Sequence, residues 1–309
     1  DKDMIDVVDV QESGAVGNPD PREVTETGTG VHIALIDTGL GSDWRDVLGD
    51  DKVDVALARS FVEGARTANG LSVGPEFPNP LPGNLWEHDF CLHGTAVAAP
   101  ITGMTIGSTR VDGVAPGAKL IPLKIIGNGC TSFSLTGHNP QSTTSTLSRV
   151  LAAFDYLIGL KEQHIIGPTI LSLSIGWRRR PLAEIGINAV LSAGIIVVQA
   201  AGNSGELGSE VYPQVISVGS IGWTKQFRPG TLASPDRDFW WTQDVGFDPD
   251  PVSGPDESSE AFVSIFSSRA IPSLGQELDL LAPANHVVLP VASVSGTSFD
   301  SVGGTSFAA

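Results

Sequence analysis

Five β-prone runs of mostly apolar residues constrain the fold of this chain more than any other feature. They cover residues 31–36, 119–126, 168–176, 195–203 and 215–219. Strands of a parallel sheet that is buried on both faces read as unbroken apolar runs, whereas half-exposed strands alternate. Helical patterns separate several runs: apolar residues recur at spacings of three and four over 147–158, and 181–193 begins with proline and ends before a glycine. The alternation predicts an α/β fold, with three α/β/α layers around a mostly parallel central sheet.

Length, composition and charge limit the domain organisation and the class of partner. With 309 residues, of which 41% are hydrophobic and 17% charged, the chain can bury one large core. We expect an N-terminal arm over residues 1–27, one domain over 28–309, and an aromatic and acidic insertion at about 223–260. The net charge of −17 argues against nucleic acid or an anionic membrane as the principal partner. No apolar run reaches the roughly 18 residues that a membrane-spanning helix needs.

A carboxylate follows the first apolar run directly. Asp37 stands at the carboxyl end of this predicted strand, the edge at which open α/β sheets place functional groups. The alternative is a turn aspartate that caps the loop. Gly28 and Gly30 do not form a dinucleotide-binding fingerprint, because they precede the strand instead of following it. Asp37 is therefore a candidate for chemistry at the edge of the sheet.

Two further motifs place a reactive side chain among small residues. His93 is followed by Gly-Thr-Ala-Val-Ala, which predicts a helix packed tightly against the sheet with the imidazole near its beginning. Ser306 lies within Gly-Gly-Thr-Ser-Phe-Ala-Ala, and Gly-Thr-Ser also occurs at 296–298. Alone, a histidine at this place is more often structural than catalytic, and neither serine is marked as a nucleophile. Ser306 is preferred because residues that can begin a packed helix follow it, whereas Phe-Asp follows Ser298.

Taken together and in order, these motifs resemble those of the subtilase superfamily of serine proteases, peptidase family S8. The resemblance rests on an aspartate motif, VHIALIDTG at 31–39, a histidine motif, HGTAVA at 93–98, and a serine motif, GTSFAA at 304–309. It also rests on an oxyanion segment, AAGN at 200–203, and a substrate-pairing edge, SIG at 174–176. The likeness extends over residues 28–309 and implies a subtilisin-like fold with the catalytic order Asp, His, Ser.

The resemblance implies a role for each polar residue in the hydrolysis of a peptide bond. Asp37, His93 and Ser306 would form the catalytic triad, with Ser306 as nucleophile and His93 as general base. The Asn203 side chain and the Ser306 backbone N–H would stabilise the oxyanion. The structural alternative for Asn203 is a turn residue between glycines.

The implied substrate is a protein or peptide. Ser174, Ile175 and Gly176 would pair with an extended peptide as an added strand. The expected function is a serine endopeptidase, and the alternative is a catalytically silent, peptide-binding domain of the same family. An α/β-hydrolase acting on esters is a weaker competitor, because no Gly-x-Ser-x-Gly elbow joins a predicted strand directly to a helix.

The remaining expectations concern the surroundings of the site. Leu92 stands where the family usually has glycine, and Ala96 replaces a common second histidine. The chemistry requires no cofactor; a structural calcium ion is compatible with the family, and no metal ligand is assigned. Cys91 and Cys130 form either one disulfide or two buried thiols.

We also expect a monomer with an extracellular location, although the acidic first residues do not form a signal peptide. In the family the serine motif opens a long buried helix, so we expect the chain to be truncated at its C-terminus.

Overall fold

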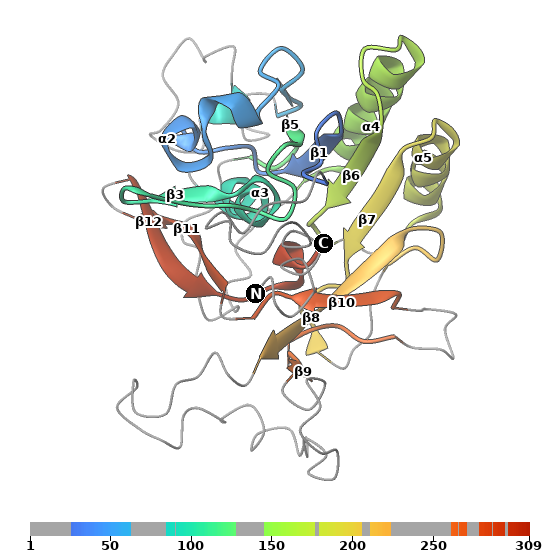
Figure 1. The fold of residues 1–309 in the computed structure, drawn as a ribbon. Coiled ribbons are helices and arrows are strands. Elements are labelled where there is room, and N and C mark those ends of the chain that lie inside the picture. The colour runs from blue at the N-terminus through green and yellow to red at the C-terminus, as the bar shows by residue number, and fades with distance from the viewer. Residues whose placement is uncertain are drawn as a thin grey trace, which may run out of the picture.

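A parallel β-sheet forms the centre of the protein, as a computed structural model shows (Figure 1). Seven strands neighbour one another in parallel pairs, and β9 (Ala261–Val263) joins β8 in the antiparallel direction. The order across the sheet is β10 (Leu280–Pro283), β8 (Ile216–Trp223), β7 (Ile196–Ala200), β6 (Thr169–Leu173), β1 (His32–Asp37), β5 (Lys119–Lys124) and β2 (Arg59–Ser60). The predicted central sheet is therefore confirmed.

The structure describes residues 26–62, 85–89, 91–127, 145–176, 179–205, 211–223, 261–264, 266–270, 278–285, 287–293 and 296–309. The predicted N-terminal arm, except for its last two residues, lies outside these ranges. The predicted insertion at 223–260 lies outside them as well, except for its first residue. Both remain predictions.

Helices cover both faces of the sheet (Figure 1). Side chains of β1 alternate between two cores: Ala34 and Ile36 pack in the first core, and Ile33 and Leu35 in the second. Burial on both faces explains why residues 33–36 of this strand are all apolar, and the three-layer α/β/α arrangement is confirmed. The first core is built with α4 (Leu147–Glu162) and α5 (Pro181–Ser192), and the second with α2 (Trp44–Leu48), α3 (His93–Thr102) and the hairpin of β11 (Val287–Ser293) and β12 (Gly296–Val302).

The helical patterns of the sequence are confirmed as α4 and α5. In α4 the recurring apolar residues face the sheet, and Val150, Phe154 and Leu157 are buried. Pro181 is the first residue of α5, where its missing N–H leaves no hydrogen bond unmade. The short elements are η2 (Asp50–Lys52), η3 (Leu85–Glu87), β3 (Met104–Ile106), β4 (Thr109–Val111) and η9 (Thr305–Phe307).

Of two local expectations, one needs correction. The apolar pattern predicts a strand over 53–57, but Val53 makes only an isolated bridge to β5 and the chain then turns. The turn forms because the Asp54 carbonyl oxygen accepts hydrogen bonds from the N–H groups that follow at positions 57 and 58. Pro122 suggests an edge strand or a bulge. β5 lies between β1 and the very short β2, which pairs only with the two residues after Pro122, so β2 gives Pro122 no partner on that side.

The order of the strands creates a reversal point beside β1. The chain runs from β1 to β5 on one side, then passes over to β6 on the other side and continues outward through β7 and β8. Ligand sites of open α/β sheets lie at the carboxyl ends of the strands at such a reversal. The ends of β1 and β6 lie side by side there, since Leu35 pairs with Ser172.

Candidate active site

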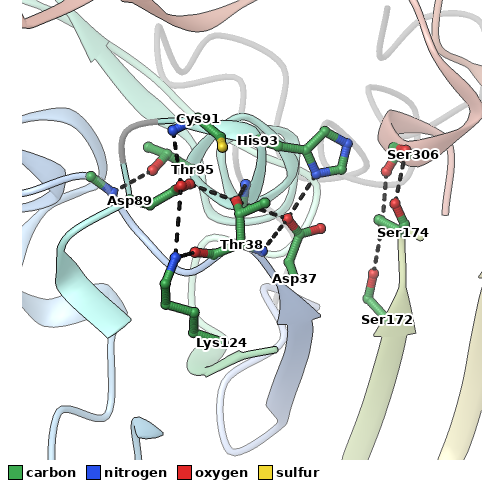
Figure 2. Close-up of polar contacts among 12 residues, drawn as sticks. Asp37, Thr38, Asp89, Cys91, His93, Thr95, Lys124, Ser172, Ser174 and Ser306 are labelled. Atoms are coloured by element: carbon green, nitrogen blue, oxygen red, sulfur yellow. Dashed lines mark hydrogen bonds and ion pairs between the residues drawn. The ribbon is translucent and has the colours of Figure 1, made fainter. Parts of the chain in front are cut away.

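Asp37 and His93 meet where β1 ends and α3 begins (Figure 2). The Nδ1 atom of His93 lies 2.7 Å from Oδ1 of Asp37. A carboxylate can only accept, so Nδ1 carries the proton and Nε2 keeps its lone pair for a second partner. Gly94 makes this approach possible, because a Cβ there would stand 2.1 Å from the Gly39 carbonyl oxygen. The aspartate and histidine motifs are thus brought together as expected.

The environment makes His93 a stronger base than an ordinary histidine. Burial alone would lower the pKa of His93, but the charge of Asp37, the hydrogen bond to Asp37 and the charge of Asp89 outweigh burial and raise the pKa. The ring of Phe307 lies 5.9 Å from the imidazole, centroid to centroid, and covers it from the side of the serine motif. A side chain with these properties can remove a proton from a neighbouring hydroxyl near neutral pH.

A buried polar network behind Asp37 was missed by the sequence reasoning (Figure 2). The Thr38 hydroxyl lies 2.6 Å from Oδ2 of Asp89 and 3.1 Å from Oδ1 of Asp37. Lys124, at the end of β5, donates to the Thr38 carbonyl oxygen and lies 4.0 Å from Oδ1 of Asp89. Burial raises the pKa of Asp89 to about 6 despite the opposing charge of Lys124. The signal in the sequence was a lysine inside an apolar strand.

Ser306 lies in η9, which contacts α3, β7 and β8. Its hydroxyl donates to the Ser174 carbonyl oxygen at 2.9 Å, and the Ser174 hydroxyl donates to the Ser306 carbonyl oxygen at 2.8 Å. This reciprocal pair fixes the serine motif to the end of β6, beside the end of β1 (Figure 2). The proton of Ser306 is therefore directed at the Ser174 carbonyl oxygen.

The near copy of the serine motif lies elsewhere. Ser298 is part of β12, and its hydroxyl is 3.5 Å from the Val291 carbonyl oxygen across the hairpin. Ser306 is the serine at the carboxyl edge of the sheet, which favours it over Ser298 as the candidate nucleophile.

Asn203 follows β7 and is held by the residue before Ser306. Its Oδ1 atom accepts hydrogen bonds from the backbone N–H and the hydroxyl of Thr305, each at 2.9 Å. An N–H can only donate, so the amide orientation is determined and the Nδ2 donor faces away from Thr305. The Thr305 hydroxyl in turn accepts the Gly202 N–H at 3.1 Å. Thr305, which the sequence reasoning did not single out, thus orients the candidate oxyanion donor.

The candidate substrate edge continues β6 beyond its last paired residue. Ser174 is buried against Ser306, Ile175 is half-buried and Gly176 is exposed. A Cβ built on Gly176 would meet nothing within 4 Å, so there is open space beside this backbone. An extended peptide fits such an edge. The roles predicted for Ser174, Ile175 and Gly176, and those predicted for Asp37, His93, Ser306 and Asn203, stay predictions.

The residues just before His93 carry two unusual features. Leu92 has a φ of 54°, the left-handed region that favours glycine, which gives a physical reason for the glycine usual at this position in the family. Cys91 is disulfide-bonded, and the chain contains one other cysteine, Cys130, which lies outside the described residues.

The described residues offer neither a metal cluster nor a membrane span. Among them, no group of three or more His, Cys, Asp and Glu residues is arranged to hold a metal ion. Every helix described is too short or too polar to cross a membrane. The expectation that no cofactor is needed is untested, and so is the compatibility with a structural calcium ion, for which no ligand is assigned.

Comparison with known proteins decides the family. Residues 28–309 match the subtilase family, peptidase S8. The chain belongs to the subtilase family. Among curated relatives, it is 31% identical over 195 residues to the subtilisin-like protease SBT1.2 of Arabidopsis thaliana, covering 59% of this chain and 21% of the relative. It is 26% identical over 211 residues to subtilisin E of Bacillus subtilis, covering 65% of this chain and 43% of the relative.

A third relative is described as an extracellular protease, from Xanthomonas campestris. It is 27% identical over 187 residues, which cover 57% of this subtilase and 30% of the relative. The chain thus spans less than half the length of each of these three relatives.

Solved structures confirm the subtilisin-like fold. Sphericase matches with a TM-score of 0.58 and 20% identity, over 97% of this chain and 78% of that one. A cold-adapted subtilisin-like serine proteinase matches with a TM-score of 0.52 and 18% identity, over 98% of this chain and 79% of that one.

Proposed function

We propose that this subtilase is a serine endopeptidase that acts through Asp37, His93 and Ser306. The observation that carries the proposal is the 2.7 Å contact between Nδ1 of His93 and Oδ1 of Asp37, at the sheet edge where Ser306 also lies. Family membership over residues 28–309 supports hydrolysis of peptide bonds as the reaction. Two of the curated relatives are named as proteases, and this chain covers only part of each.

In the proposed first half-reaction, Oγ of Ser306 attacks the carbonyl carbon of the peptide bond while Nε2 of His93 takes its proton. Asp37 holds the imidazole in the required tautomer and stabilises the imidazolium without becoming protonated. The carbonyl oxygen gains negative charge, which Nδ2 of Asn203 and the Ser306 backbone N–H stabilise. His93 then returns the proton to the leaving amine, and an acyl group remains on Ser306.

In the second half-reaction, water attacks the acyl group. His93 takes a proton from this water and gives it to Oγ of Ser306 as the acid product leaves. The backbone of residues 174–176 would bind the substrate beside the nucleophile. Because the Ser174 carbonyl oxygen accepts the Ser306 hydroxyl, a peptide that pairs with this edge would displace that hydroxyl toward His93.

We also propose that proteins or peptides outside the cell are the substrates. The disulfide at Cys91 supports an oxidising compartment, and one relative is named as an extracellular protease. We further propose that the protein acts as a monomer and that its chemistry requires no cofactor.

Turnover of internally quenched peptides tests the function. The purified protein should cleave peptide bonds inside the chain of its substrate. Ser306→Ala, His93→Ala and Asp37→Ala should each lower kcat by about 10⁴-fold or more, the magnitude found for subtilisins. Combining the changes should add little, since the three residues act as a unit. If the wild-type protein binds these peptides but cleaves none of them, the catalytically silent, peptide-binding alternative would be established instead.

A further inference from the structure

A buried ion pair that the proposed mechanism does not use lies directly behind Asp37. Asp89 and Lys124 are 3% and 1% exposed, and they come from the loop before α3 and from the end of β5. Burying two charges costs free energy, and a pair of neutral side chains often replaces such a pair without loss of stability. A contribution to packing is therefore a poor explanation for a charged pair that Thr38 links to the candidate triad.

The Thr38 hydroxyl connects this pair to Asp37. It accepts the Gly94 N–H at 2.9 Å, and it faces Oδ2 of Asp89 at 2.6 Å and Oδ1 of Asp37 at 3.1 Å. A hydroxyl has one proton, so it donates to one carboxylate at a time. The shorter contact assigns that proton to Asp89.

All hydrogen bonds from described residues to the Asp37 side chain go to Oδ1. That oxygen accepts hydrogen bonds from Nδ1 of His93 at 2.7 Å and from the Thr38 backbone N–H at 2.6 Å, and it also faces the Thr38 hydroxyl. A hydroxyl donor at Oδ1 would withdraw negative charge from the contact with His93. The direction in which Thr38 donates therefore affects how strongly Asp37 holds the imidazolium.

We propose that Asp89, paired with Lys124, is a positioning residue that draws the Thr38 proton away from Asp37. This inference rests on the proposed function. While Asp89 is ionised, Thr38 donates to it and Asp37 keeps its charge for His93. When Asp89 is neutral, Thr38 donates to Oδ1 of Asp37 and His93 becomes a weaker base.

Lys124 keeps Asp89 ionised in this arrangement. Its Nζ lies 4.0 Å from Oδ1 of Asp89, and its charge opposes the effect of burial on the pKa of that carboxyl. The other charged groups that face Asp89 are Asp37, which raises its pKa, and His93, whose own pKa Asp89 raises. Glu87, two residues away, is engaged by Arg45 at 2.9 Å. Neutralising Lys124 should therefore have the same direction of effect as neutralising Asp89.

Kinetics on the purified protein give the first test. Asp89→Asn should lower kcat on the order of tenfold, the effect of one charge-assisted hydrogen bond, with KM changed by less than about twofold. Asp89→Asn should have little further effect in the Thr38→Val background, because the hydroxyl whose proton Asp89 draws away is then absent, whereas Thr38→Ser should keep the full effect of Asp89→Asn. Thr95→Val is the matched control, because Thr95 is equally buried and its hydroxyl accepts the Gly41 N–H instead.

Titration of His93 by imidazole NMR gives a readout that does not depend on turnover. In the Ser306→Ala background, which prevents self-digestion, Asp89→Asn should lower the proton affinity of His93 by roughly tenfold, and Thr38→Val should abolish this dependence. Asp89→Asn combined with Lys124→Met removes both charges, and this double variant replaces the single variant if Asp89→Asn alone impairs folding. The double variant should lower kcat and the proton affinity of His93 as Asp89→Asn does.

The outcomes separate this inference from the proposed function. Wild-type kcat in the neutral double variant, a His93 proton affinity indifferent to Asp89, or additive effects of Asp89→Asn and Thr38→Val would each overturn the positioning role. A wild-type protein without turnover would overturn the proposed function alone, because the His93 titration still decides whether Asp89 acts on Asp37 through Thr38.

Discussion

Replacing Asp89 with asparagine should make the protein more stable at neutral pH, although it breaks a buried ion pair. The pKa of the Asp89 carboxyl is raised from 3.8 to about 6, mainly by burial. The native state thus holds this proton more tightly than the unfolded chain does. Between those two pH values the free energy of unfolding falls as pH rises, because only the native state keeps the proton.

The size of this effect follows from the pKa values. A rise of about two units at ~1.4 kcal/mol each gives a loss of about 3 kcal/mol that is complete above pH ~6 and absent below pH ~4. The amide that replaces the carboxyl cannot ionise and resembles the protonated carboxyl in shape. The two proteins should therefore be equally stable near pH 4, and Asp89→Asn should be more stable by about 3 kcal/mol near pH 7.

Urea unfolding from pH 4 to pH 8 measures the difference. Both proteins should carry Ser306→Ala, so that self-digestion does not distort the curves. Greater stability of the variant at pH 7 would show that burial outweighs the attraction to Lys124, as the 4.0 Å separation suggests. A variant less stable than the parent by ~3 kcal/mol at pH 7 would refute this reasoning, because the ion pair would then be strongly stabilising.

Three further predictions follow from other contacts. Thr305→Val removes one of the two hydrogen bonds that orient Asn203, so kcat should fall about tenfold with little change in KM. Thr305→Ser should restore kcat. An unaffected kcat in Thr305→Val would contradict the role of Asn203 as an oxyanion donor. Gly94→Ala places a Cβ 2.1 Å from the Gly39 carbonyl oxygen and should lower the unfolding free energy by about 3 kcal/mol or more. Gly176→Ala, with open space around it, should change the unfolding free energy by less than ~0.5 kcal/mol. Equal melting temperatures of the two variants would contradict the tight packing of α3. Because the pKa of His93 is raised above 6.5 and only the neutral imidazole accepts a proton, the acid limb of kcat/KM should lie above pH 6.5, and a midpoint below it would contradict the balance of charges around His93.

The sheet and its covering helices could be predicted because their residues are patterned locally. Residues 33–36 are all apolar because both faces of β1 are buried, and α4 shows its sheet-facing side at helical spacing. The same reasoning placed Asp37 at a strand end and His93 at a helix start. It was wrong at 53–57, where a backbone turn at Asp54 overrides the apolar pattern.

The network behind Asp37 could not be predicted because it depends on pairing between distant segments. Thr38 and Asp89 are 51 positions apart, and Thr38 and Lys124 are 86 positions apart. They meet only because β5 pairs in register with β1, which sets Lys124 beside Asp37. The left-handed backbone of Leu92 was equally invisible, since leucine does not indicate a positive φ.

Covalent labelling of the nucleophile tests the central claim most directly. Phenylmethylsulfonyl fluoride should add once to the purified protein by intact mass, and peptide mapping should place the adduct on Ser306. The reaction should slow by orders of magnitude in His93→Ala, because the hydroxyl then lacks its base. An adduct on Ser298, or a protein that cleaves peptides while Ser306 stays unmodified, would contradict the assignment of Ser306 as the nucleophile.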